Sequence, residues 1–237
     1  MRMSEEKMCQ DCNNTGFILY KDEAGHEYGK RCKCVEIERA RNLLRKSGLA
    51  MEFQKKTFDD FVTHNDERLN DAKNTVMQYA KQFQNIRGEQ GNSLIICGQV
   101  GAGKTHLGTA CCRQMMDDGV AVIYMGYRDA VTTLKSKVTD APGYKAEVEK
   151  YKKAKVLFID DFLKGRITEA DVNVMYEIVN FRYNNRMPLV ISTEKDLNQM
   201  LAFDEAITSR LIEMSKGHIV MLKGSELNYR IYRGGAA

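Results

Sequence analysis

The sequence of 237 residues contains no run of apolar residues that approaches the roughly 18 needed to cross a membrane. Met1 to Gln10 is polar, whereas a secretory signal peptide would be apolar there. The chain also lacks the composition of a disordered protein, because 43% of its residues are hydrophobic and its formal net charge is only +4. It has no internal repeat and no low-complexity tract. These absences predict a folded, cytoplasmic protein with no membrane partner, built as one full domain with an appendage.

The seven cysteines fall into two groups. Cys9, Cys12, Cys32 and Cys34 form a C-x2-C pair and, after nineteen intervening residues, a C-x-C pair. Each pair presents two thiolates to one metal ion, and four thiolates suit tetrahedral Zn2+. Disulfides are disfavoured in a cytoplasmic chain, and simple buried thiols would leave the pairing unexplained. The spacing therefore predicts a zinc site, and the remaining three cysteines, which have apolar neighbours, are interpreted as core thiols.

The residues between the two cysteine pairs predict a hairpin like that of a zinc ribbon. Residues 17–28 have the pattern of a strand, a turn and a returning strand. An amphipathic helix is expected over 35–47, with Gly48 as its stop signal, and it packs either on its own module or on a partner. We therefore divide the chain into a zinc-binding module with a linker (1–50) and a second domain (51–237). The small module has little core of its own, so metal would have to hold it together.

A glycine-rich loop follows a short apolar run at residues 93–97 and precedes a helical pattern. It has the form G-x4-G-K-T, which in this setting of strand, loop and helix is typical of a nucleoside triphosphate site. The glycines let successive backbone N–H groups point at phosphate oxygens, and the helix adds the positive end of its dipole. Lys104 is expected to reach the β and γ phosphates, and Thr105 to offer its hydroxyl to Mg2+. The predicted phosphate-binding residues are Gly98, Gln99, Val100, Gly101, Ala102, Gly103, Lys104, Thr105 and His106.

Two acids end an apolar strand predicted over residues 155–161. Asp160 is expected to hold Mg2+ through water, and Asp161 stands where an attacking water would be polarised. A strand with a simple capping aspartate is the alternative, which the position downstream of the glycine-rich loop disfavours. The pair of acids therefore predicts a catalytic role.

Further apolar strands are expected at 121–125, 189–192 and 219–222. They alternate with helical patterns at 70–87, 128–139, 171–184 and 206–215. Five strands separated by helices predict an α/β fold with a five-stranded parallel sheet flanked by helices. Ligands of such sheets bind at the carboxyl ends of the strands, where Gly98, Asp160 and Thr193 all fall.

These segments together resemble the AAA+ ATPases of the replication-initiator branch, and most closely the DnaC/DnaI-type helicase loaders in their phage and prophage forms. The resemblance covers nearly the whole chain. It rests on the two cysteine pairs, the segment TFDDF (57–61), the loop GQVGAGKT, the strand VLFIDD and the segments LVIST and ITSRL. It implies a P-loop AAA+ domain without the C-terminal helical lid, so Arg230 and Arg233 are poor candidates for a lid contact.

The resemblance assigns further residues to the nucleotide site. It implies that Thr57, Phe58 and Phe61 line the adenine pocket, although a role as core residues explains the aromatics equally well. It also implies that Thr193 senses the γ-phosphate, with Glu194 following where many relatives have Asn.

Arg210 stands in the Ser-Arg-Leu setting of an arginine finger. By resemblance it acts on ATP bound by a neighbouring subunit, which implies self-association through the ATPase interface. A surface salt bridge is the alternative. Asp161 is shorter than the Glu of many AAA+ proteins, which implies slow hydrolysis.

The interval 127–166 holds ten Lys and Arg against six Asp and Glu, an excess equal to that of the entire chain. Such a stretch can follow a phosphate backbone by displacing counterions. An apolar stripe in the expected helix leaves Arg128, Lys135 and Lys137 available to solvent, and the resemblance assigns these three residues to single-stranded DNA. A solvated charged face is the alternative.

Three functions compete. The resemblance implies a loader whose front module grips a hexameric replicative DNA helicase while its ATPase domain engages single-stranded DNA. A transposition helper of the IstB type has a similar ATPase core, but it polymerises on duplex DNA and generally lacks the cysteine module. A nucleotide-gated binding protein with negligible turnover is suggested by Asp161 and Glu194. The expected cofactors are ATP, Mg2+ and Zn2+.

Overall fold

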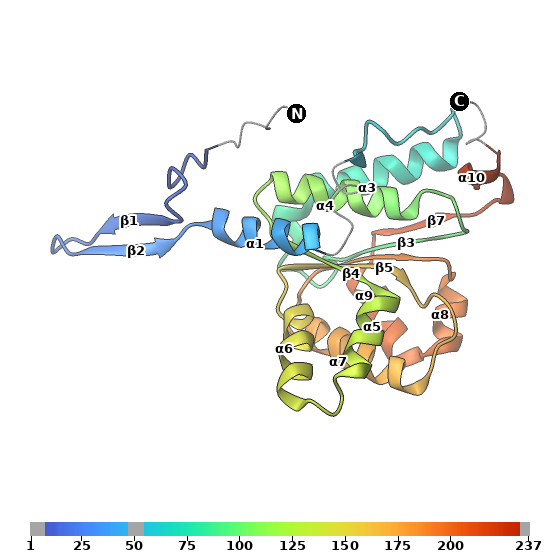
Figure 1. Ribbon diagram of the computed structural model, residues 1–237. Coiled ribbons are helices and arrows are strands. Elements are labelled where there is room, and N and C mark those ends of the chain that lie inside the picture. Colours follow the sequence, from blue (N-terminus) through green and yellow to red (C-terminus); the bar gives the residue numbers. More distant parts are fainter. Residues whose placement is uncertain (1–7, 47–54, 233–237) are drawn as a thin grey trace.

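A five-stranded parallel sheet forms the centre of the molecule (Figure 1). The computed structural model describes residues 8–46 and 55–232. The strands lie in the order β4-β5-β6-β3-β7, and neighbouring strands are parallel throughout. The predicted α/β fold is therefore confirmed. The strands span Leu94–Gly98 (β3), Val122–Gly126 (β4), Val156–Phe162 (β5), Leu189–Thr193 (β6) and Ile219–Leu222 (β7).

Helices cover both faces of this sheet (Figure 1). Leu94 and Ile96 of β3 lie in the core under α3 and α4, whereas Ile95 and Cys97 lie in the core under α5 to α9. Because both faces are buried, the strands have continuous apolar sequences rather than alternating ones. The helices span Glu67–Ile86 (α3), Lys104–Asp117 (α4), Tyr127–Ser136 (α5), Ala141–Lys152 (α6), Glu169–Asn184 (α7), Leu197–Phe203 (α8) and Glu205–Met214 (α9).

The interval between β4 and β5 folds into two helices, α5 and α6, where the sequence predicts one helix over 128–139. Asp140 caps α6 by accepting the backbone N–H of Gly143 at 3.2 Å, and Pro142 stands in the first turn. Proline is favoured there because the first N–H groups of a helix have no intrahelical acceptor. The capping residues thus start a helix that the periodicity did not reveal.

The fully buried Arg182 of α7 joins α6 to the sheet. Its guanidinium donates to the carbonyls of Tyr151 and Ala154 at 2.9 Å each, and to that of Pro188 at 2.5 Å. The last carbonyls of a helix lack intrahelical partners, so Arg182 satisfies the end of α6 and fixes it beside the start of β6.

The front segment forms the predicted hairpin and helix. Strands β1 (Phe17–Lys21) and β2 (Glu27–Arg31) are antiparallel and are followed by α1 (Lys33–Lys46). The hairpin projects away from the five-stranded sheet and its helices (Figure 1), whereas α1 contacts the outer strand β4. Gly48 and the proposed boundary between residues 50 and 51 lie outside the described residues.

After β7 the chain forms a short 3-10 turn, η1 (Ser225–Leu227), and a single helical turn, α10 (Tyr229–Tyr232). The backbone N–H of Tyr229 donates to the carbonyl of Gly101 at 3.1 Å, so this segment lies against the glycine-rich loop. Across residues 8–46 and 55–232, no helix has both the length and the apolar character that a membrane span requires.

Candidate functional site

The glycine-rich loop joins β3 to α4 at the carboxyl edge of the sheet. Gly98 and Gly103 have φ angles of 153° and 87°. A Cβ atom at Gly98 would lie 2.5 Å from the carbonyl oxygen of Leu222, and one at Gly103 would lie 2.5 Å from the ring of Phe61. Only glycine fits such positions. Gly103 is also the N-cap of α4, which brings the positive end of that helix to the loop.

A cavity of about 350 Å³ opens over the loop. Residues 100–106 line it, whereas Gly98 and Gln99 shape the start of the loop without lining the cavity. The rest of the lining joins charged side chains with apolar ones. It consists of Lys56, Asp60, Phe61, Val62, Leu69, Asp161, Lys164, Glu194, Leu227, Tyr229 and Arg230. A nucleotide requires both kinds of surface, polar groups for its phosphates and apolar ones for its base.

Asp160, at the end of β5, lies against the start of α4. Its carboxylate accepts the hydroxyl of Thr105 at 3.0 Å and that of Tyr124 at 3.1 Å, and Ser192 donates to it as well. Burial raises the pKa of Asp160 above its usual range, and the hydroxyls of Ser192 and Thr105 offset part of that effect. A carboxylate next to a threonine hydroxyl matches the oxygen ligands of Mg2+. The structure thus brings together the two residues of the predicted magnesium site.

Lys104 and Asp161 both line the cavity, as their predicted roles require. The ammonium of Lys104 donates to the carbonyl of Gln99 at 2.6 Å, and burial lowers the pKa of this lysine. Asp161 has a left-handed backbone, with φ of 56°. Its carboxylate accepts Lys164 Nζ at 2.8 Å, and the same Nζ lies 3.4 Å from Glu194 Oε1.

Thr193 does not line the cavity, and its role as the γ-phosphate sensor stays a prediction. Its side chain is fully buried, and its hydroxyl donates to the carbonyl of Phe162 at 2.7 Å and accepts the N–H of Lys195 at 3.1 Å. The next residue, Glu194, faces the cavity instead. The strand end therefore presents an acid where a neutral polar group is expected.

The segment 57–61 divides between the site and the core. Phe61 lines the cavity and packs edge-on against His106, with ring centroids 5.2 Å apart. Phe58 packs against the core under α3 and α4. Thr57 supplies the carbonyl that contacts His106 Nε2 at 2.7 Å and does not line the cavity. Of the three residues predicted beside the adenine, the structure thus places only Phe61 in the cavity wall.

Four apolar residues of the cavity wall are absent from the sequence prediction: Val62, Leu69, Leu227 and Tyr229. They come from three separate stretches of the chain and belong to no motif. Arg230, which the sequence analysis gives as a poor candidate for a lid contact, also lines the cavity. The only sequence signal for this wall is proximity to the TFDDF segment, which identifies Val62 alone.

Arg210 lies on α9 and lines neither the cavity over the glycine-rich loop nor a second cavity beside the loop between β5 and α7. Its guanidinium carbon lies 5.4 Å from the ring centroid of Tyr176 and 5.5 Å from that of Tyr183, and it donates to the carbonyl of Ala206 at 2.6 Å. Two aromatic faces therefore hold the charged group. This placement is compatible with action on a neighbouring subunit, which stays a prediction.

The predicted DNA-contacting residues differ in their surroundings. Lys135 pairs with Asp171 at 2.7 Å and Lys137 with Glu147 at 3.6 Å, and both lysines remain partly exposed to solvent. Their partners come from α7 and α6, which the helix pattern alone does not bring close. Arg128 is exposed and donates to the carbonyl of Lys164 at 3.5 Å.

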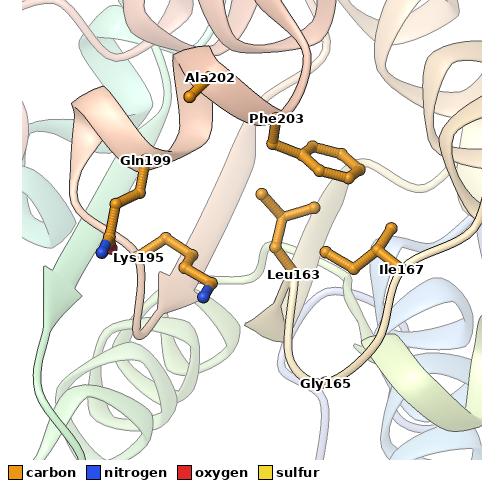
Figure 2. A pocket seen from close by; sticks show the side chains of 7 residues that line it. All are labelled: Leu163, Gly165, Ile167, Lys195, Gln199, Ala202 and Phe203. Atoms are coloured by element: carbon orange, nitrogen blue, oxygen red, sulfur yellow. The ribbon is translucent and has the colours of Figure 1, made fainter.

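The loop between β5 and α7 also borders a second cavity of about 340 Å³ (Figure 2). Leu163, Ile167 and Phe203 gather on one side of it, and Lys195 and Gln199 on the other. Lys164 faces the first cavity. One short loop therefore contributes to both.

The four cysteines of the front segment form one cluster. Their sulfur atoms all lie within 4.8 Å of one another, with Cys9 and Cys32 at 3.7 Å and Cys12 and Cys34 at 3.4 Å. Four sulfurs around a tetrahedral zinc ion, at about 2.3 Å each, are about 3.8 Å apart. The cluster therefore fits a metal ion. The other three cysteines are fully buried, as core thiols should be; they are Cys97, Cys111 and Cys112.

Known proteins resemble this chain in sequence and in fold. The family model of the IstB-like ATP binding proteins matches residues 20–233. Two proteins of Bacillus subtilis (strain 168) are similar along most of their length: YqaM is 35% identical over 98% of this chain and 77% of its own, and the phage-like element PBSX protein XkdC is 32% identical over 94% and 86%.

Solved structures with this fold include those of DnaC and DnaI. The crystal structure of the DnaC helicase loader superposes with a TM-score of 0.61 at 21% identity, over 73% of this chain and 99% of that one. The crystal structure of DnaI gives a TM-score of 0.58 at 18% identity, over 73% and 90%. With its glycine-rich loop and paired acids, the chain belongs to the IstB/DnaC-like family of AAA+ ATPases.

Proposed function

We propose that the protein is an ATP-dependent loader that delivers a hexameric replicative DNA helicase onto single-stranded DNA in the cytoplasm. The observation that carries this proposal is the projecting hairpin (Figure 1). Phe17, Leu19 and Tyr28 are each more than half exposed on it, at 51%, 74% and 53%. Exposed apolar side chains on an extended ribbon suit docking to another protein. An ATPase of the DnaC fold with such a module suits the role of a helicase loader.

The cysteine cluster supports this role, and we assign it to structural Zn2+. The turn before β1 and the start of α1 converge on the cluster, one from each side of the hairpin, so the ion would fix the base of the docking surface. Four thiolates with no open coordination position are typical of structural rather than catalytic zinc. Residues 1–50 would then act as the docking module and residues 51–237 as the ATPase domain.

ATP binding and hydrolysis would switch the loader between assembly and release. Lys104 would hold the phosphates, and Thr105 with Asp160 would hold Mg2+, which neutralises the charge that develops on the phosphates. Asp161 would orient the attacking water. Arg210, held between two tyrosines, would complete the site of a neighbouring subunit and so tie hydrolysis to self-association.

Single-stranded DNA would be bound along the basic interval that contains Arg128. This residue contacts the loop that follows Asp161. A DNA contact there would be close to the hydrolytic end of the cavity. Lys135 and Lys137 would take part only by exchanging their carboxylate partners for phosphate.

The test is a binding and loading assay with the full chain. Size-exclusion chromatography with light scattering should detect a stable complex with a hexameric replicative helicase, and adding ATP should change its composition. Unwinding of a closed circular template should require the protein and ATP. Lys104→Ala should still dock but fail to load. Absence of a complex with intact, metal-loaded protein would contradict the proposal.

A second candidate is a transposition helper, favoured by the family match to IstB-like proteins. Such a protein would polymerise on duplex DNA when ATP is present. Electron microscopy separates the two: filaments on duplex DNA, without helicase binding, would support the helper function and reject the loader.

A further inference from the structure

The ammonium of Lys164 bridges two carboxylates inside the nucleotide cavity. Its Nζ lies 2.8 Å from Asp161 Oδ2 and 3.4 Å from Glu194 Oε1. All three side chains line the cavity together with Lys104 and Thr105 of the phosphate loop. Lys164 is therefore a lysine, additional to Lys104, at the end of the cavity that Asp161 and Glu194 line.

The backbone fixes Lys164 in this position. The N–H of Lys164 donates to the carbonyl of Asp161 at 3.1 Å, which closes a tight turn. Both intervening residues, Phe162 and Leu163, are 1% exposed and anchored in the core. Asp161 and Leu163 have φ angles of 56° and 61°, a region that non-glycine residues rarely adopt. Such backbone conformations persist only where the surrounding structure maintains them.

Lys164 offsets negative charge in the wall of the cavity. Asp161 and Glu194 place two negative charges in a wall that must admit a triphosphate. Thr193, at the end of β6, donates its hydroxyl to the carbonyl of Phe162, and Ser192 donates its hydroxyl to Asp160. Without another cation at this end, the two carboxylates would repel the γ-phosphate. The hydrogen bond to Asp161 raises the pKa of Lys164 above its usual range, so the cation persists through the working pH range.

We propose that Lys164 is a γ-phosphate-binding residue that acts within its own subunit, where it takes the place of the neutral sensor at the end of β6. Before ATP binds, the ammonium holds Asp161 and Glu194. When ATP binds, the ammonium contacts the γ-phosphate oxygens and keeps Glu194 neutralised. Asp161 is then released to the attacking water. The inference deepens the ATPase activity of the proposed function and needs neither helicase nor DNA.

The test compares nucleotides with and without a γ-phosphate. Isothermal titration of the full chain with Mg2+ and either ADP or a non-hydrolysable ATP analogue reports the two affinities. Lys164→Met should lower the affinity for the ATP analogue by about tenfold, the typical effect of losing one charged hydrogen bond. The affinity for ADP should stay within about twofold of that of the wild type. Lys164→Arg should retain most of the selectivity, because the positive charge stays. ADP binding also verifies that the variant folds.

Two further variants sharpen the result. Arg166→Met is the matched control, because Arg166 is an exposed cation on the same loop that does not line the cavity. It should change neither affinity. Glu194→Gln in the Lys164→Met background should recover part of the analogue affinity, because it removes one repelling charge.

An equal loss of affinity for ADP and for the ATP analogue would overturn the inference, since Lys164 would then support the cavity as a whole. Unchanged analogue affinity would overturn it too. A failed loading assay with intact γ-phosphate selectivity would instead reject the loader function and leave the role of Lys164 standing.

Discussion

The front hairpin and the ATPase domain are held together by different means. Between residues 8 and 34 only Cys12 and Cys32 are buried, and the strands expose their large side chains. The ATPase domain buries apolar clusters on both faces of its sheet. Burial of apolar surface is the main stabilising contribution to a fold. The hairpin therefore depends on its cysteine cluster, whereas the ATPase domain depends on its core.

Removal of the proposed Zn2+ should produce the largest effect on stability and should confine that effect to the hairpin. Structural zinc contributes about 10 kcal/mol or more in small zinc domains. Chelation, or Cys12→Ser, should therefore abolish amide protection in β1 and β2, as measured by hydrogen exchange. Affinity for ADP should stay within about twofold.

Cys112→Ser is the matched control for that experiment, because Cys112 is buried in the ATPase core. It should lower the stability of the ATPase domain and leave the metal content unchanged. Hairpin amides that stay protected without metal would show that the hairpin does not depend on its cysteine cluster for stability.

Arg182→Met should destabilise the ATPase domain strongly. It leaves the carbonyls of Tyr151 and Ala154 without the guanidinium that donates to them in a buried site, and the carbonyl of Pro188 keeps only the N–H of Leu157 at 3.3 Å. Hydrogen bonds to a charged group contribute about 1.5–3 kcal/mol each, so the free energy of unfolding should fall by about 3 kcal/mol or more. Urea titration measures it. Arg186→Met, at an exposed position close by, should change it by less than about 0.5 kcal/mol.

Asp160→Asn should stabilise the nucleotide-free protein by about 1 kcal/mol while abolishing ATP hydrolysis. Burial raises the pKa of Asp160, so its ionised form opposes folding above that pKa. The gain should be present near neutral pH and disappear as the pH falls and wild-type Asp160 becomes protonated. Thermal unfolding at several pH values checks this. A variant less stable than wild type near neutral pH would show that the carboxylate itself supports the fold.

Substitutions in the basic interval should have the smallest effects on stability. Lys137→Ala breaks a half-exposed ion pair, for which less than about 1 kcal/mol is expected. Arg128→Ala should weaken binding of single-stranded DNA more than Lys137→Ala does. Lys137 has to release the carboxylate of Glu147 before it can bind a phosphate, whereas the contact seen for Arg128 is with a backbone carbonyl. Fluorescence anisotropy at two salt concentrations measures both. Equal losses would favour a general charge effect over a defined contact.

The sequence predicts best those features that depend on neighbours in the chain. The phosphate loop needs glycines at fixed spacing, and each buried strand needs a continuous apolar run, so both are visible locally. Side-chain partners from distant elements are not. Lys135 finds Asp171 on another helix, and the hydroxyl of Thr193 turns to a carbonyl of β5. The apolar wall of the cavity is likewise assembled from separate stretches of the chain, none of which carries a recognisable motif.

The contact between α1 and β4 bears on how the ATPase domain behaves without its front segment. β4 is an outer strand of the sheet, and a bare outer strand offers unpaired N–H and C=O groups to any other chain. A helix alongside it restricts that approach. Truncation at residue 50 would remove this helix, and the shortened protein should be more prone to aggregation through edge-to-edge strand pairing.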